Sequence, residues 1–306
     1  MGNLLSPIVV FSYNRPDHLR RTLDALAKND LANESILYIY CDGAKENASE
    51  EQQLQVNKNR EVAHAVRGFK ELYVVEREHN IGLKDNIVSA VTEIVNQYGR
   101  IITLEDDIIT SVGFLRFMND ALECYKDEDK VMHVSAYFYA NKERLPETFF
   151  YEVPYPGGGW ATWKRAWQYY DDDTAAVYDY WKSRWKEFNK FGGTDLQHQL
   201  EQNYSGEKRT WFIKWHAAIL KRKGLSLFPK KSLTTNIGFD GSGVNCCVTN
   251  KFYIDDLQDY VVVKPIPLKE NKKAARIAKV FKNGHWYSKR NRTLFLKRMK
   301  SLFGFK

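Results

Sequence analysis

RIITLEDDIITSVGF, residues 100–114, places three consecutive carboxylates between two apolar runs. The acids are Glu105, Asp106 and Asp107, and isoleucines flank them on both sides. A buried strand does not ordinarily end in three acids, because an unpaired buried carboxylate costs several kcal/mol or shifts its pKa until it is neutral. Three partners could stand opposite these charges: a metal ion, a basic side chain or solvent.

Around this stretch, apolar runs typical of buried strands alternate with segments of helical periodicity. The strand-like runs are residues 7–16, 36–43, 71–78, 101–108 and 130–137. Helical patterns stand between them, the first opening at Pro16. Strands that alternate with helices predict βαβ units and therefore a mostly parallel sheet.

Polar side chains gather where these strands end. Arg15 follows the first strand, Asp42 the second, residues 80–84 the third, and the acid triplet closes the fourth. Ligands of parallel sheets bind at the carboxyl ends of the strands, so we expect a binding site at this edge. Carboxylates at this edge would suit a hard divalent cation, which they could bind together with the phosphates of a substrate. Taken singly, each feature has an alternative: a solvated loop or helix start for the acids, a turn for Asp42, and a surface position for Arg15.

Tryptophan becomes dense after residue 150, with seven between residues 160 and 215. Helical spacing predicts that Trp160, Trp163 and Trp167 are mostly core, although one or two tryptophans at a cleft would offer an apolar platform to a sugar. His133, on a predicted strand, is expected to be a satisfied core or rim residue rather than a ligand.

Two glycine-rich segments each have both a structural and a ligand-binding interpretation. The glycines at 157–159 suit a turn, and they would also let the backbone approach a ligand closely. The sequence DGSG at 240–243 is typical of a loop, either a lid over a ligand or an ordinary surface loop.

The charge of the chain is unevenly distributed. Residues 269–306 hold 13 Lys and Arg against one acid, a net charge of +12, so the other residues carry 33 basic and 37 acidic side chains, a net of −4. The mildly acidic body argues against a nucleic-acid partner. Residues 285–306 alternate apolar and basic side chains, which predicts an interfacial helix on an anionic membrane surface; a solvated or RNA-binding tail is the alternative.

Composition predicts a soluble chain. No apolar run of about 18 residues exists, and the first residues lack the basic region and cleavage site of a signal peptide. The four cysteines show no CxxC spacing, which predicts free thiols in a reducing compartment. We therefore expect a cytoplasmic protein, peripheral on the inner face of the cell membrane if the tail binds lipid.

The order of the motifs is VVFSYNRP, CDG, NIG-K, LEDD, GGGW and NIGFDGSG. In this order the chain resembles the GT-A nucleotide-sugar glycosyltransferases, more narrowly the N-acetylglucosaminyltransferase I-like enzymes and bacterial glycosyltransferases of surface-polysaccharide synthesis, over about residues 7–247. The resemblance implies a GT-A (Rossmann-like), mostly parallel α/β sheet flanked by helices. It also implies a nucleotide-sugar-binding subdomain (1–135), a Trp-rich acceptor subdomain (136–268) and a basic amphipathic tail (269–306).

The resemblance also implies roles for individual residues. Asp107 would bind the metal, Mn²⁺ or Mg²⁺, that bridges the donor diphosphate, while Arg15 and Asp42 would hold the uracil end. The residues implied for nucleotide-sugar binding are Arg15, Asp42, Ile81, Lys84, Glu105, Asp106 and Ser242. Those implied for the sugar and acceptor pocket are Gly159 and Trp160.

One segment departs from the family pattern. Related enzymes can carry an aspartate between two tryptophans as the general base, whereas here residues 211–215 read WFIKW, without an acid. An inverting transferase needs a base near the acceptor hydroxyl. Asp240 and Glu207 are the candidate substitutes by sequence, with Asp195 as a third. The base and the stereochemical outcome therefore stay open, with inversion expected.

The sequence thus predicts a metal-dependent glycosyltransferase that moves a hexose or N-acetylhexosamine from a UDP-sugar to a hydroxyl of a glycan acceptor, expected to be a lipid-linked bacterial surface-polysaccharide intermediate. A nucleotidyltransferase acting on sugar phosphates is one alternative. It would usually carry a GxGxR-type loop after the first strand, where this chain has SYNRP. A non-catalytic sugar-binding protein without a base is the other.

Overall fold

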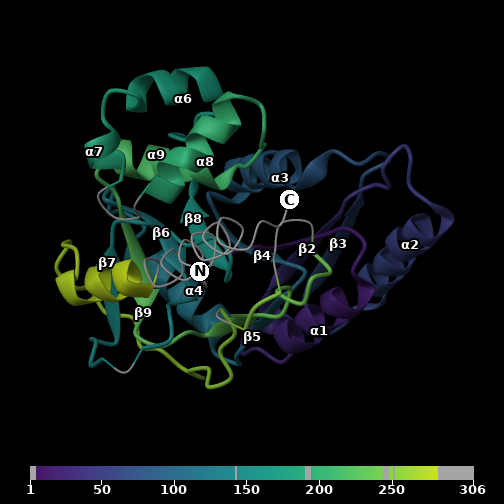
Figure 1. The fold of residues 1–306 in the computed structure, drawn as a ribbon. Helices are drawn as coiled ribbons and strands as arrows, with labels where there is room; N and C mark the ends of the chain where they lie inside the picture. The colour runs from purple at the N-terminus through teal and green to yellow at the C-terminus, as the bar shows by residue number, and fades with distance from the viewer. Residues whose placement is uncertain (1–4, 142, 190–193, 244–247, 251, 282–306) are drawn as a thin grey trace, which may run out of the picture.

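A computed structural model of the chain describes residues 5–141, 143–189, 194–243, 248–250 and 252–281. Within these residues, eight strands form one central sheet (Figure 1). Their order across the sheet is β3 (Glu71–Glu76), β2 (Ile36–Cys41), β1 (Ile8–Ser12), β4 (Arg100–Glu105), β8 (Trp160–Trp163), β6 (Val131–Ser135), β9 (Leu225–Pro229) and β7 (Thr148–Tyr151).

Most of these strands run in one direction. The pairs β1–β2, β2–β3, β1–β4 and β6–β9 are parallel, whereas β8 is antiparallel to both β4 and β6, and β7 is antiparallel to β9. Only β8 and β7 therefore oppose the others in the described sheet. The predicted α/β class with a mostly parallel central sheet flanked by helices is confirmed.

Helices cover both faces of the sheet. They are α1 (Pro16–Ala27), α2 (Glu50–Ala65), α3 (Gly82–Tyr98), α4 (Phe114–Cys124), α5 (Lys164–Trp167), α6 (Thr174–Trp181), α7 (Trp185–Phe188), α8 (Thr194–Tyr204) and α9 (Phe212–Lys221), with a 3₁₀ turn at Ala32–Glu34. Figure 1 shows α6, α7, α8 and α9 gathered together, away from α1 and α2. The Trp-rich part of the chain supplies this helical group.

The alternation of side chains along β1 shows why its first four residues are all apolar. Ile8 and Val10 pack in a core cluster with side chains of α1, α2 and α4. Val9 and Phe11 pack on the other face with α3 and α9. A strand buried on both faces needs a continuous apolar run, which is the pattern of parallel sheets between two helical layers.

Local signals in the sequence set several helix ends. Pro16 occupies the first turn of α1, where its missing N–H is not needed. Ser49 and Gln52 form a reciprocal capping box at the start of α2, and the Asp173 carboxylate caps α6. The left-handed Gly99, with φ of 78°, ends α3.

A small second sheet joins two segments that are far apart in the chain. The strands β5 (Ile108–Thr110) and β10 (Thr234–Asn236) pair antiparallel, with Asn236 opposite Ile108. This pairing places residues 236–238 directly beside the acid triplet.

The start of the predicted tail belongs to the folded body. Residues 272–281 are helical, and Ala274 and Ala278 are fully buried. Phe281 stacks on Tyr139 with ring centroids 4.4 Å apart. Small and apolar side chains at helical spacing thus pack this first part of the predicted tail against the core, while the division at residue 269 stays a prediction. The predicted membrane-binding residues 285–306 lie outside the described residues.

Other predictions of organisation have mixed outcomes. The boundary predicted at residue 135 falls within the central sheet, since β8 lies between β4 and β6, and the functional division between 1–135 and 136–268 stays a prediction.

No helix among the described residues has the length and apolar character to cross a membrane. Cys41 and Cys124 are free thiols, whereas the other two cysteines lie outside the described residues.

His133 lies in the core, as expected. It is fully buried on β6, its Nδ1 accepts a hydrogen bond from Trp215 Nε1 at 3.3 Å, and its ring stacks on Trp160. Its Nε2 lies 3.3 Å from the Tyr155 carbonyl oxygen, so the neutral ring with hydrogen on Nε2 satisfies both contacts. Burial lowers the pKa of His133 to about 3.

This buried histidine predicts a loss of stability in acid. Between about pH 6.5 and pH 3 the unfolded chain binds a proton that the folded chain does not, so the free energy of unfolding falls as the pH falls. We expect His133→Phe to reduce this slope by up to about 1.4 kcal/mol per pH unit, measured by chemical denaturation. His198→Gln, at a position 69% exposed on α8, is the control. Equal slopes for wild type and His133→Phe would contradict the assignment.

Candidate functional site

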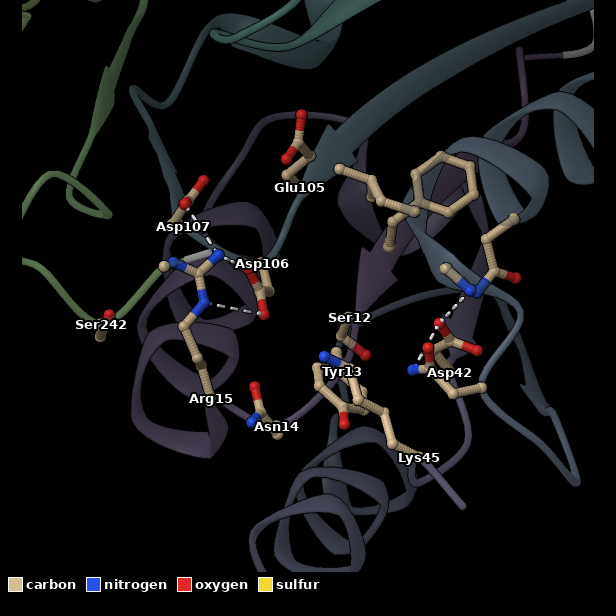
Figure 2. A pocket seen from close by; sticks show the side chains of 16 residues that line it. Ser12, Tyr13, Asn14, Arg15, Asp42, Lys45, Glu105, Asp106, Asp107 and Ser242 are labelled. Atoms are coloured by element: carbon tan, nitrogen blue, oxygen red, sulfur yellow. Dashed lines mark hydrogen bonds and ion pairs between the residues drawn. The ribbon is translucent and has the colours of Figure 1, made fainter. Parts of the chain in front are cut away.

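A cavity of about 280 Å³ lies at the carboxyl ends of β1, β2 and β4 (Figure 2). The segments that line it follow these three strands, open α3, or belong to the loop after β10. The lining residues are Phe11, Ser12, Tyr13, Asn14, Arg15, Asp42, Lys45, Asn80, Gly82, Leu83, Asn86, Glu105, Asp106, Asp107, Ser242 and Gly243. The edge of the sheet that the sequence indicated therefore does carry a cavity.

The acid triplet forms one wall of this cavity. Glu105 ends β4 opposite Phe11 of β1, and Asp106 and Asp107 follow in the turn before β5. Asp106 and Asp107 are buried, whereas Glu105 is half-buried. In Figure 2 the three carboxylates point in different directions, so they are not equivalent.

A basic side chain stands opposite two of the three acids. Arg15, at the N-cap of α1, places Nη2 against Asp106 Oδ1 and 2.8 Å from Asp107 Oδ2. Its Nε also donates to Asp106 Oδ2 at 3.4 Å. Of the three partners considered for the triplet, the structure thus places the basic side chain there. The prediction that Arg15 holds the uracil end is not supported by this position, because its guanidinium is engaged by the acids.

The backbone around the acids is also tied down. Thr22 Oγ1 donates to the Asp106 carbonyl at 2.7 Å, and the Ile237 N–H donates to the Asp107 carbonyl at 2.9 Å. Asn236 Nδ2 donates to Asp107 Oδ1 at 3.2 Å. Asp107 is therefore held from two sides, by Arg15 just before α1 and by Asn236 and Ile237 at the end of β10.

Burial and mutual repulsion favour the protonated forms of two acids of the triplet. Burial raises the pKa of Glu105 to about 8, and the charges of Asp107 and Asp106 raise it further. Burial also raises the pKa of Asp106 to about 7, against the opposing effect of Arg15. Near neutral pH these raised pKa values keep Glu105 mostly protonated, so a divalent cation at this wall would bind by displacing protons from the carboxylates.

These residues fit a divalent cation of one particular kind. Among the described residues, no group of three or more His, Cys, Asp or Glu side chains forms a metal cage. Mg²⁺ and Mn²⁺ do not need one where substrate phosphates supply the other ligands, since one or two carboxylates then suffice. The carboxyl groups of Asp106 and Asp107, which line the cavity, satisfy that requirement.

Asp42 organises the opposite wall. Its carboxylate accepts hydrogen bonds from the N–H groups of Ile81 and Gly82 at 3.0 and 2.9 Å and from Asn80 Nδ2 at 3.0 Å. The Gly43 N–H donates a fourth. Asp42 thus fixes the turn that opens α3, which is a positioning role that the spacing in the sequence did not reveal.

Several predicted nucleotide-binding residues lie beside the cavity rather than in its lining. Ile81 is 38% exposed and contributes its N–H to Asp42. Lys84 Nζ pairs with Asp172 at 2.7 Å and with Asp85 at 3.1 Å. Conversely, sequence reasoning missed Lys45, which lines the cavity two residues after the CDG motif.

The predicted sugar-pocket residues are core residues in this structure. Trp160 is 3% exposed and stacks on Trp211 with ring centroids 5.0 Å apart. A side chain at Gly159 would meet the Phe114 ring at 3.1 Å. Neither residue lines the cavity. Trp160 is therefore a core residue and does not form a sugar-binding platform in this cavity.

The predicted bases also lie outside the lining. Glu207, in the loop before α9, accepts a hydrogen bond from Gln202 Nε2 at 2.7 Å. Asp240 pairs with His18 of α1 at 3.1 Å, and hydrogen bonds from Ser242 lower the pKa of Asp240 to about 2. That pKa makes Asp240 a weak proton acceptor at neutral pH. Ser242 and Gly243 of the same loop do line the cavity.

The segment that departs from the family pattern carries a buried cation. Lys214, on α9 between the two tryptophans, is 3% exposed and pairs with Asp172 Oδ1 at 2.7 Å. Its Nζ also donates to the Asp172 carbonyl at 2.9 Å. The charge at this position is therefore opposite to that of the expected base, and it serves to hold the loop before α6.

No family model matches the chain, and no curated protein sequence does. Among solved structures, S. aureus TarS is 21% identical over 47% of this chain and 23% of its own, with a TM-score of 0.30. A Pyrobaculum calidifontis mannosyltransferase described in complex with GDP-Man and Mn²⁺ is 10% identical over 72% of this chain and 70% of its own, with a TM-score of 0.36. Mouse xyloside xylosyltransferase 1 is 9% identical over 71% and 82%, with a TM-score of 0.38.

The chain thus spans about a quarter of the length of that TarS chain. All three TM-scores lie below 0.5, so the function is inferred below from the geometry of the site.

Proposed function

We propose that the chain is a metal-dependent glycosyltransferase that moves a hexose or N-acetylhexosamine from a UDP-sugar to a hydroxyl of a glycan acceptor. One observation carries the proposal: a carboxylate triplet and a hydrogen-bonded turn at the start of α3 face each other across a cavity at the carboxyl edge of parallel strands. This arrangement suits a ligand with an anionic centre and a polar heterocyclic end.

The proposed donor lies along this cavity. Asn14, Asn80 and Asn86 offer polar groups to the base and ribose, and Lys45 offers a cation to the phosphates. Glu105 and Asp106 would face the ribose and the transferred sugar. Ser242 and Gly243 would close the open side and exclude water from the reacting centre.

Asp107 would hold Mn²⁺ or Mg²⁺ together with the donor diphosphate. When bound, the metal offsets the charge that develops on the leaving UDP. The protein's own contribution is to aim Asp107 at the cavity through Asn236 and the β10 backbone. Inversion at the anomeric carbon is part of the proposal. Glu207 and Asp240 are the proposed bases, although neither lines the cavity and the low pKa of Asp240 makes it the weaker proton acceptor. A lipid-linked bacterial polysaccharide intermediate is the proposed acceptor.

A panel of nucleotide sugars tests this function. With Mn²⁺ at saturation, we expect a UDP-sugar at 100 times its dissociation constant to stabilise the fold by about 2.7 kcal/mol, seen as a rise in melting temperature. GDP-sugars and free sugars serve as matched controls. Release of UDP that increases with added glycan acceptor would support transfer. Stabilisation by no nucleotide sugar would contradict the proposal.

The same panel separates the alternatives. A nucleotidyltransferase would release pyrophosphate from a nucleoside triphosphate and a sugar phosphate. A non-catalytic binding protein would be stabilised by the sugar ligand without releasing UDP under any condition. The position of both predicted bases outside the cavity lining is the observation that keeps this second alternative in the test.

A further inference from the structure

We propose that Arg15 is a resident counter-cation that occupies the metal-binding carboxylates until the donor arrives, so that metal binding depends on the donor diphosphate. The inference rests on the proposed function for the identity of the diphosphate. Its first part, competition between Arg15 and a divalent cation, concerns only residues of this chain.

The contacts of Arg15 place its guanidinium where a cation would be held. Nη2 contacts both Asp106 Oδ1 and Asp107 Oδ2, and it lies between the two carboxylates in Figure 2. The Arg15 side chain is 16% exposed, and those of Asp106 and Asp107 are 6% and 5% exposed. The other carboxylate oxygen of Asp107 already accepts from Asn236. A divalent ion at Asp107 would therefore stand beside a guanidinium of like charge, which is unfavourable in a buried site.

The residues around Arg15 restrict the directions in which its guanidinium can move away from Asp107. A Cβ atom at Gly238 would lie 2.9 Å from Arg15 Nη1 and 2.0 Å from Asp107 Oδ2, so the backbone of this loop closes one side of the ion pair. Arg15 itself lines the cavity on the other side. The guanidinium is therefore blocked on the side of Gly238, and it can leave Asp107 toward the space that the proposed donor would fill.

A diphosphate would give the Arg15 guanidinium a new anionic partner when it leaves Asp107. Uncovering a buried guanidinium without a new anion is strongly unfavourable. Phosphate oxygens accept bidentate hydrogen bonds from arginine, so the donor can take Arg15 from Asp107 while the metal takes its place. Metal and diphosphate should then bind with positive coupling, and the coupling must be the same whichever ligand binds first.

The test measures Mn²⁺ binding directly, from the electron paramagnetic resonance signal of free Mn²⁺, with and without UDP. Wild type is compared with Arg15→Met, with Arg15→Lys, which keeps a charge but loses the fork of donors, and with Arg21→Met, an exposed arginine on the same helix. Chemical denaturation establishes that each variant is folded. The readout needs no enzyme activity.

Without UDP, we expect Arg15→Met to bind Mn²⁺ about tenfold more tightly than wild type, Arg15→Lys to lie between them, and Arg21→Met to equal wild type. UDP should tighten Mn²⁺ binding at least about tenfold in wild type and much less in Arg15→Met. If Arg15→Met does not fold, tighter binding by Arg15→Lys alone supports the competition, and its absence contradicts it.

The outcomes distinguish this inference from the proposed function. Unchanged or weaker Mn²⁺ binding by the Arg15 variants, in a protein that does bind Mn²⁺ and UDP, overturns the role of Arg15 and leaves the glycosyltransferase proposal standing. Tighter Mn²⁺ binding by these variants without any effect of UDP supports the competition and contradicts a UDP-sugar donor. Absence of Mn²⁺ binding in all variants overturns both.

Discussion

Replacing Asp107 by asparagine is expected to abolish metal-dependent sugar transfer, with a loss of about a thousandfold in kcat/KM. Asparagine has nearly the same shape, so the hydrogen bond from Asn236 can persist, but the charge that would hold the cation is gone. The metal's contribution to the transition state is several kcal/mol, and about 4 kcal/mol corresponds to a thousandfold change in rate. UDP release with acceptor, over a titration of Mn²⁺, measures the loss.

Asp24→Asn is the matched control, because Asp24 is exposed on α1 and does not line the cavity. Asp107→Asn also removes one charge from a crowded triplet, so we expect its free energy of unfolding to stay within about 1 kcal/mol of wild type. An Asp107→Asn protein that retains more than about a tenth of wild-type turnover would contradict the assignment of Asp107 to the metal.

Gly238→Ala is expected to lower transfer about a hundredfold by displacing Asp107. The added Cβ would lie 2.0 Å from Asp107 Oδ2 and 2.7 Å from its Cγ, which is too close for either to remain in place. The Asp107 side chain is tethered by Asn236 and Arg15, so it cannot rotate away without breaking one of these contacts. A displacement of about 1 Å at a catalytic group can cost a hundredfold in rate.

A second glycine provides the control for this substitution. At Gly157, a Cβ would meet the Tyr155 hydroxyl at 3.4 Å, an ordinary van der Waals distance. Gly157→Ala should therefore change turnover and Mn²⁺ affinity far less than Gly238→Ala. Equal activities of wild type and Gly238→Ala would show that the position of Asp107 does not limit the reaction.

The position of the cavity at the carboxyl edge of the sheet could be predicted from the sequence, because it depends on the order of residues within single strands. Each of the strands β1, β2 and β4 is an apolar run followed at once by polar residues, and parallel strands bring such ends together whatever the rest of the chain does. Trp160 and His133 lie in the core as expected, but Trp160 and Trp163 belong to the strand β8 and not to the helix that their spacing predicted. The sugar-pocket role of Trp160 came from the resemblance alone, and the structure buries the residue instead.

What stands opposite the acids was decided by tertiary structure. Arg15 is 91 residues before Asp106, and Asn236 is 129 residues after Asp107, so no local pattern relates them. The parallel pairing of β1 with β4 brings the first contact, and the pairing of β5 with β10 brings the second. The buried Lys214 in the segment expected to hold a base depends in the same way on the loop before α6.

By itself, then, the amino-acid sequence determined the strands β1, β2, β3, β4 and β6 and the edge of the sheet where charge collects, because hydrophobic periodicity and chain direction are properties of short segments. Only the tertiary structure decided that Arg15 neutralises two of the three acids, that Asp42 holds the turn before α3, and that Gly238 leaves room for Asp107. These facts depend on contacts between distant segments, and burial then makes each charge need a partner at hydrogen-bonding distance.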